Sequence, residues 1–99
     1  MADFENNVHH LASVPINGRD QHIAVEVAAD LVHSVVRKPW FDLTDRQKQL
    51  LVKPSTKRLW DGYMAGRRKG ESTKEAARKA MLQELSVLEQ QFKSGSKRK

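Results

Sequence analysis

The four histidines are the side chains of this sequence best suited to binding a metal ion, but their spacing argues against a shared site. His9 and His10 are adjacent, so their side chains diverge on any regular element. His22 and His33 would lie roughly 16 Å apart along a helix, which is too far for one ion to bind both. No cysteine is present to complete a zinc site. We therefore expect no metal and no cofactor.

Paired carboxylates are the next candidates for chemistry. Glu26 and Asp30 are four residues apart, which places them side by side on a helix, an arrangement used in general acid–base catalysis. Arg37 lies near enough to neutralise them, and no second acidic pair is placed to converge with them. Neither the glycine-rich phosphate-binding motifs nor the G-x-S-x-G nucleophile motif occurs. The sequence predicts a protein that is not an enzyme.

Positive charge is the strongest functional signal in the chain. Residues 1–50 contain seven acids and five bases, whereas residues 51–99 contain five acids and thirteen bases. Such asymmetry favours association with polyanions or acidic proteins through the second half. We predict a basic patch and a basic tail as the binding surface. The patch consists of Lys57, Arg58, Arg67, Arg68, Lys69, Lys74, Arg78 and Lys79, and the tail contributes Lys97, Arg98 and Lys99.

Two classes of partner remain open for this surface. The first is nucleic acid, bound through its phosphates without sequence preference, or an acidic protein. Residues 53–55 have roughly the spacing of a helix-turn-helix turn but lack its glycine, so specific reading of DNA is less favoured. The second class is a protein-interaction module or inhibitor that uses an apolar helix face. Leu82 and Val87 lie off the main apolar stripe of residues 73–93, so a homodimer through that helix is part of this alternative.

The elements that position these residues are helices. From Ala24 to Val35, apolar residues recur three and four positions apart, the period of one helix face. Asp20 is expected to cap this helix, and Pro39 to end it, which gives a helix over 21–37.

Three further helices are predicted from caps and breakers. Thr44 opens a capping box before a helix over 45–52, which would bury Leu50 and Leu51 and stop at Pro54. Ser55 then caps a helix over 56–69, in which Trp60 and Tyr63 are expected to belong to the core. A second capping box, at residues 72–75, opens a helix over 73–93.

These elements add up to one all-α domain, a small bundle of three to four helices. The expected organisation is a partly ordered N-terminal arm over 1–19, a helical domain over 20–93 and a disordered basic tail over 94–99. No run approaches the roughly 20 apolar residues of a membrane span, and the first residues are polar rather than leader-like. We expect a soluble, cytoplasmic protein that does not associate with membranes.

One stretch has a family resemblance. The run from Ile23 to Leu51, with His33, Pro39-Trp40 and Leu43 ahead of a short helix, resembles the opening of RyR-type repeat domains. It covers under a third of the chain, and the later motifs of that family are not recognisable, so no function is carried over. In its general character (short, without cysteine, helical and basic) the chain also resembles small phage accessory proteins.

Overall fold

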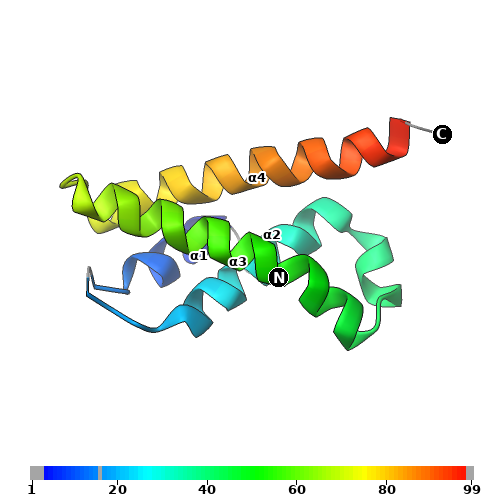
Figure 1. Cartoon of the computed structure of the whole chain (residues 1–99), viewed down its shortest axis with the longest axis horizontal. Helices are drawn as coiled ribbons and strands as arrows, with labels where there is room; N and C mark the ends of the chain where they lie inside the picture. Colours follow the sequence, from blue (N-terminus) through cyan, green and yellow to red (C-terminus); the bar gives the residue numbers. More distant parts are fainter. Residues whose placement is uncertain (1–3, 16, 98–99) are drawn as a thin grey trace.

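Helices make up all the regular structure in the part of the chain that the computed structural model describes, which is residues 4–15 and 17–97, with side chains as far as Phe92. In chain order these are α1 (Phe4–Ala12), α2 (Gln21–Val36), the 3-10 helix η1 (Lys38–Asp42), α3 (Asp45–Arg68) and α4 (Thr73–Lys97) (Figure 1). The predicted all-α bundle is confirmed. None of these helices is both long enough and apolar enough to cross a bilayer.

The first long helix forms where the apolar period predicted it. Ala24, Val27 and Leu31 are among the buried residues of α2, which ends at Val36 ahead of Pro39. The predicted side-chain cap is wrong: Asp20 has a ψ of 64°, outside the extended region that aims a capping side chain at the first turn. Its backbone carbonyl instead accepts a hydrogen bond from the Ile23 N–H at 3.0 Å.

The largest correction concerns α3, which is one helix where two were predicted. Pro54 lies inside it and cannot donate to the carbonyl of Leu50, and Figure 1 shows the helix changing direction in this region. Ser55, the predicted cap, is instead fully buried within the helix, and its hydroxyl has no hydrogen-bond partner among the residues that the structure describes. Packing of both halves against the neighbouring helices outweighs the single lost backbone hydrogen bond.

A continuous α3 also changes which of its residues are buried. Its buried residues include Val52, Ser55, Leu59 and Tyr63, which are spaced three and four apart from just before Pro54 towards the end of the helix. Leu50 is off this face and is exposed, against the prediction that it packs in the core. The residues after Pro54 therefore determine which side of α3 faces the core. The residues before Pro54 continue the same helical period, which leaves Leu50 on the exposed side.

Two glycines of α3 lie on the side of the helix that meets α4. A Cβ on Gly62 would lie 3.4 Å from the Cβ of Ala80, and one on Gly66 would lie 3.0 Å from the Cβ of Ala76. The spacing of four places both on one side of α3, so the backbones can approach without a side chain between them. Of the two, only Gly66 lies where a Cβ would be crowded, against Glu71 and Ala76.

Helix α1 packs part of the N-terminal arm against the rest of the bundle. α1 buries Val8 and Leu11 completely, and it packs against α2 and α4. Val14, just after α1, is also buried, and its carbonyl accepts a hydrogen bond from the hydroxyl of Tyr63. Burial raises the pKa of that hydroxyl, an effect partly opposed by the charge of Arg67. Tyr63 thus joins the core, as expected, and fixes the N-terminal segment to α3.

The last helix begins as predicted and ends later. The hydroxyl of Ser72 accepts a hydrogen bond from the Glu75 N–H at 3.2 Å, which is the serine half of the capping box. α4 continues to Lys97, four residues beyond the predicted end at 93, because one glycine at position 95 weakens a helix by only about 1 kcal/mol. Arg98 and Lys99 lie outside the described residues.

Candidate binding surfaces

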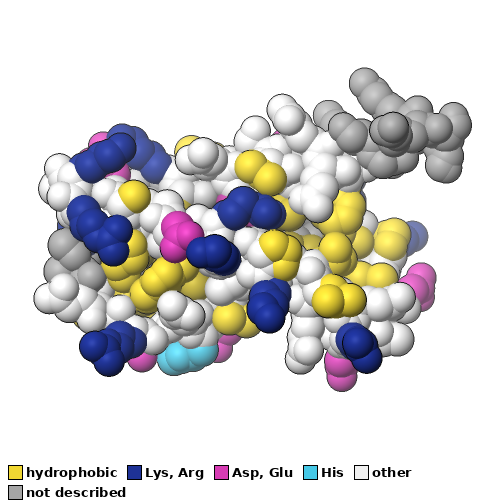
Figure 2. Space-filling view, viewed as in Figure 1, with side chains coloured by type: hydrophobic (Ala, Val, Ile, Leu, Met, Phe, Trp, Pro, Cys, Tyr) yellow, Lys and Arg dark blue, Asp and Glu magenta, His cyan; other side chains and the backbone are white. Residues whose placement is uncertain are grey.

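Ion pairs neutralise four of the eight residues of the predicted basic patch. Figure 2 shows Lys and Arg side chains distributed along one face, with acidic and apolar side chains among them. Lysine and arginine residues that have acidic neighbours attract a phosphate less strongly, because the nearby negative charge partly cancels the positive potential. The four pairs are Lys57 with Asp61, Arg58 with Glu84, Arg78 with Glu5, and Lys79 with Glu71.

Arg58 has a structural role in its pair. Its Nε and Nη2 donate to the two carboxylate oxygens of Glu84 at 2.8 and 2.7 Å, and the Glu84 side chain is only 2% exposed. These hydrogen bonds raise the pKa of the Arg58 guanidinium, although burial acts in the opposite direction. A buried carboxylate needs such a partner, so Arg58 is not available to bind phosphate.

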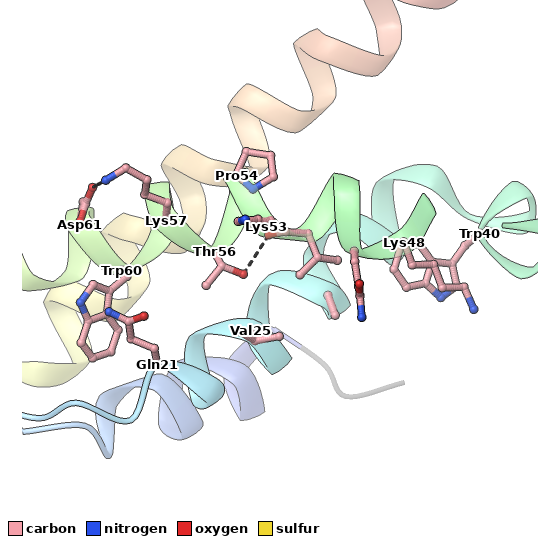
Figure 3. Close-up of a pocket in the computed structure, with 13 residues that line it drawn as sticks. Gln21, Val25, Trp40, Lys48, Lys53, Pro54, Thr56, Lys57, Trp60 and Asp61 are labelled. Atoms are coloured by element: carbon pink, nitrogen blue, oxygen red, sulfur yellow. Dashed lines mark hydrogen bonds and ion pairs between the residues drawn. The ribbon is translucent and has the colours of Figure 1, made fainter. Parts of the chain in front are cut away.

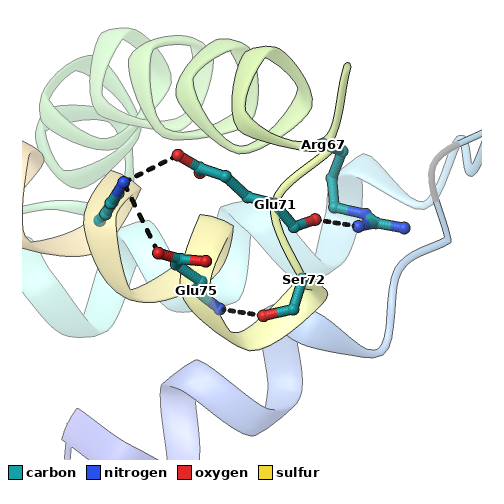
Figure 4. A network of polar contacts seen from close by, with 5 residues as sticks. Arg67, Glu71, Ser72 and Glu75 are labelled. Atoms are coloured by element: carbon teal, nitrogen blue, oxygen red, sulfur yellow. Dashed lines mark hydrogen bonds and ion pairs between the residues drawn. The ribbon is translucent and has the colours of Figure 1, made fainter. Parts of the chain in front are cut away.

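Arg67 and Lys79 are held by the segment that joins α3 to α4. The guanidinium of Arg67 donates to the backbone carbonyl of Glu71 (Figure 4). Lys79 Nζ donates to the Glu71 carboxylate at 2.8 Å and lies 3.8 Å from that of Glu75. The hydrogen bond to Glu71 raises the pKa of Lys79. These contacts order the connection and remove both side chains from the candidate surface.

Three patch residues remain free, and they are neighbours. Arg68, Lys69 and Lys74 flank the tight connection around Gly70, which adopts a φ of 95°. All three are exposed, and within the described part of the chain none has an acidic partner. We call these three residues the basic turn. Of the predicted tail, the side chain of Lys97 and all of Arg98 and Lys99 lie outside the described residues.

A second surface is a groove between α2 and α3, which the sequence analysis did not predict. It is open to solvent, has a volume of about 980 Å³ and is bounded by α2 on one side and the bent part of α3 on the other. Val25 and Ala29 from α2 and Val52 from α3 line it with aliphatic side chains. Trp40 and Trp60 lie at its opposite ends (Figure 3). We call this the α2–α3 groove.

Lysines border the α2–α3 groove, and one acid lies among its lining residues. Lys48, Lys53 and Lys57 all come from α3, and Lys57 already pairs with Asp61 at 3.2 Å. Lys53 is exposed and, among the described residues, has no acidic partner. Lys48 lies over the Trp40 ring, 5.2 Å from its centroid. The groove is therefore apolar in its interior and positive along one edge.

Aromatic residues stiffen one end of the groove. The His33 ring stacks on Trp40 with 5.5 Å between centroids and meets Phe41 edge-on at 5.0 Å. Phe41 itself is 70% exposed. His33 is thus a packed, half-buried residue, and η1 presents an aromatic corner beside the groove.

The candidate catalytic residues are engaged in contacts between helices. Glu26 Oε1 lies at hydrogen-bonding distance from His10 Nε2, 2.7 Å away, and Asp30 accepts a hydrogen bond from the Asn7 side-chain amide at 3.3 Å. Both carboxylates therefore attach α1 to α2. Among the described residues no group of three histidine or acidic side chains is placed to hold a metal ion.

The groove was missed because Pro54 was interpreted only as the end of a helix. A proline inside a helix also bends it, and the groove is lined by α3 residues both before and after Pro54. The available signal was the pair Trp40 and Trp60 together with a run of lysines at 48, 53 and 57. These positions line a common groove only if α3 is continuous, which the sequence analysis did not predict.

Comparison with protein-family models, with curated proteins and with solved structures gives no match for this chain. The resemblance to RyR-type repeat domains and to phage accessory proteins therefore has no further support. Two surfaces of the molecule, the basic turn and the α2–α3 groove, are the features that bear on its function.

Proposed function

We propose that this chain is a non-catalytic binding protein that associates with nucleic acid, without sequence preference, through the basic turn. The observation that carries the proposal is the grouping of Arg68, Lys69 and Lys74, which are exposed and have no acidic partner within the described part of the chain, while the patch residues Lys57, Arg58, Arg78 and Lys79 are paired. Three adjacent cations at a tight connection can approach a phosphate backbone together, and counterions released from that backbone favour binding.

The size of the basic turn sets the expected salt dependence. Three neutralised phosphates predict a slope of about −2.7 for the logarithm of the association constant for duplex DNA against the logarithm of salt concentration. If all eight residues of the predicted patch bound phosphates, the slope would approach about −7. Titration of a fluorescently labelled duplex by anisotropy at several salt concentrations separates these two cases.

Charge reversal tests whether binding depends on the basic turn or only on the net charge of the protein. The variant R68E/K69E/K74E takes the formal net charge from +6 to zero, and so does the control R19E/K38E/R46E. All six residues are exposed. We expect the first variant to lose oligonucleotide binding and the control to retain most of it.

Two outcomes contradict this proposal. An equal loss in both variants would mean that only net charge matters, and no binding by the unchanged protein would remove nucleic acid as a partner. Preference for an acidic polypeptide such as polyglutamate over the oligonucleotide would replace nucleic acid by an acidic protein.

A second candidate function is favoured by the α2–α3 groove. An exposed apolar groove of this size with few charged groups inside it is typical of a surface that binds another protein. A homodimer through α4, where Leu82 and Val87 are exposed as predicted, belongs to the same class. The groove carries more structural detail than the α4 face, and it leads to the inference below.

A further inference from the structure

We infer that the α2–α3 groove binds an acidic amphipathic helix of a partner protein, whose apolar side chains enter the groove while its carboxylates contact Lys48 and Lys53. This inference rests on the second proposed function, protein interaction, and does not depend on nucleic-acid binding by the basic turn. It names the site, the kind of partner and the residues that recognise it.

The dimensions of the groove suit a helix. Its lining on α3 extends from Lys48 to Asp61, which corresponds to about 20 Å along a helix axis, or about 13 residues of a bound helix. The two walls are themselves helices, and a groove between two helices is a common receptor for a third. Trp40 and Trp60 at the two ends mark the length that the occupant would fill (Figure 3).

Charge complementarity selects an acidic partner. The groove is lined by three lysines and one acid, and that acid is already paired with Lys57. Lys53 has no acidic partner within the described residues, and Lys48 has only the Trp40 ring. Carboxylates on the flanks of a docked helix would therefore meet two uncompensated ammonium groups, which also steers the partner towards the groove.

The interior of the groove favours a protein helix over nucleic acid. Val25, Ala29 and Val52 are aliphatic and offer no platform on which bases stack. The ring of Trp40 is already engaged by the stacked His33 ring at 5.5 Å and by the Lys48 ammonium at 5.2 Å. Branched aliphatic side chains instead suit leucine-type anchors at helical spacing.

The test begins with selection from a displayed library of random peptides of about 15 residues, the length that spans the groove as a helix. The unchanged full chain is the immobilised target. We expect enriched peptides to carry apolar residues three and four apart with glutamate or aspartate between them. Enrichment of peptides without this pattern, or no enrichment above an empty support, would overturn the inference.

A matched pair of variants then locates the peptide. Val25 is 43% exposed inside the groove and Leu82 is 53% exposed on α4 outside it, so V25E and L82E place the same charge on comparable surfaces. V25E should weaken a selected peptide by about tenfold or more, as expected for a central interface position, and L82E should not. If L82E weakens the peptide and V25E does not, protein interaction stands but the groove is the wrong site.

A second pair separates the two proposed partners. K48E/K53E should weaken the acidic peptide about tenfold or more and leave oligonucleotide binding in place, because it removes only the charges at the groove. K69E/K74E, with the same change in charge, should do the reverse. Circular dichroism checks that each variant is still helical. If an oligonucleotide displaces the peptide from the unchanged chain, the groove binds nucleic acid and the inference fails.

Discussion

Arg58 and Glu84 illustrate how a residue's function depends on a partner far away in the sequence. Arg58 belongs to a basic run and was predicted to bind a polyanion, yet its guanidinium holds a carboxylate that is 2% exposed. The two residues are 26 positions apart, on different helices. Their contact cannot be inferred from local charge patterns, because no periodicity relates residues on separate helices.

The pair predicts a non-additive response to substitution. Arg58→Met should destabilise the protein by about 2–3 kcal/mol, somewhat less than for a fully buried pair because the arginine is 40% exposed. The double variant R58M/E84M should recover most of that loss, since no unpaired carboxylate is left in the interior. Chemical denaturation gives the free energy of unfolding of the unchanged protein, of R58M, of E84M and of the double variant, which together form a double-mutant cycle. Additive losses would show that the two side chains act independently.

At the scale of elements, α3 and α4 are matched to one another by small residues. Gly62 and Gly66 both lie on the side of α3 that meets α4, where Ala76 and Ala80 are their neighbours. Glycine weakens a helix, so its presence here at two positions needs a reason in packing. The distances from a Cβ to the neighbouring atoms supply that reason for Gly66 but not for Gly62.

The glycine pair predicts opposite effects of the same substitution. Gly62→Ala places a Cβ 3.4 Å from its neighbour, an ordinary contact, so it should raise stability by up to about 1 kcal/mol through helix propensity. Gly66→Ala places one 3.0 Å from the Cβ of Ala76 and 2.6 Å from Glu71 Oε1, so Ala76 must give way by a few tenths of an ångström, the Glu71 carboxylate must move, and stability should fall. Thermal unfolding of both variants measures the difference. A gain for Gly66→Ala would mean that the helix contact is looser than described.

At the scale of the whole molecule, the N-terminal segment is part of the core. Leu11 is fully buried, while Leu50, which the sequence placed in the core, is exposed. α1 is also attached by Arg78 to Glu5 at 2.8 Å and by His10 to Glu26 at 2.7 Å. The cooperative unit therefore includes α1 together with the three longer helices.

Two leucine substitutions test this assignment. Leu11→Ala should cost about 2–5 kcal/mol, because it removes a fully buried side chain and leaves a cavity. Leu50→Ala should change stability by less than about 0.5 kcal/mol, as is usual for an exposed position. The free energy of unfolding in urea compares them directly. A larger loss of stability for Leu50→Ala than for Leu11→Ala would instead support the arrangement expected from the sequence, in which Leu50 is in the core.

The sequence by itself determined the helical class, the start of α3 at the Thr44 capping box and the end of α2 before Pro39. These features depend on residues within one or two turns of each other: the period of apolar positions, reciprocal caps and the restriction that proline imposes on its neighbour. The excess of basic residues in the second half was also evident from the composition, but which of these residues form ion pairs was not.

Only the tertiary structure decided which charges are free, whether α3 passes through Pro54 and where a groove opens. Each depends on contacts between residues distant in the sequence, as in Arg58 with Glu84 or Tyr63 with Val14. A proline lowers the stability of a helix by a few kcal/mol, and packing of a continuous face over two helices is of the same order. The cost of the proline can be judged from the local sequence, but the gain from packing depends on the other helices. The local sequence therefore cannot decide between the two when they are of similar size.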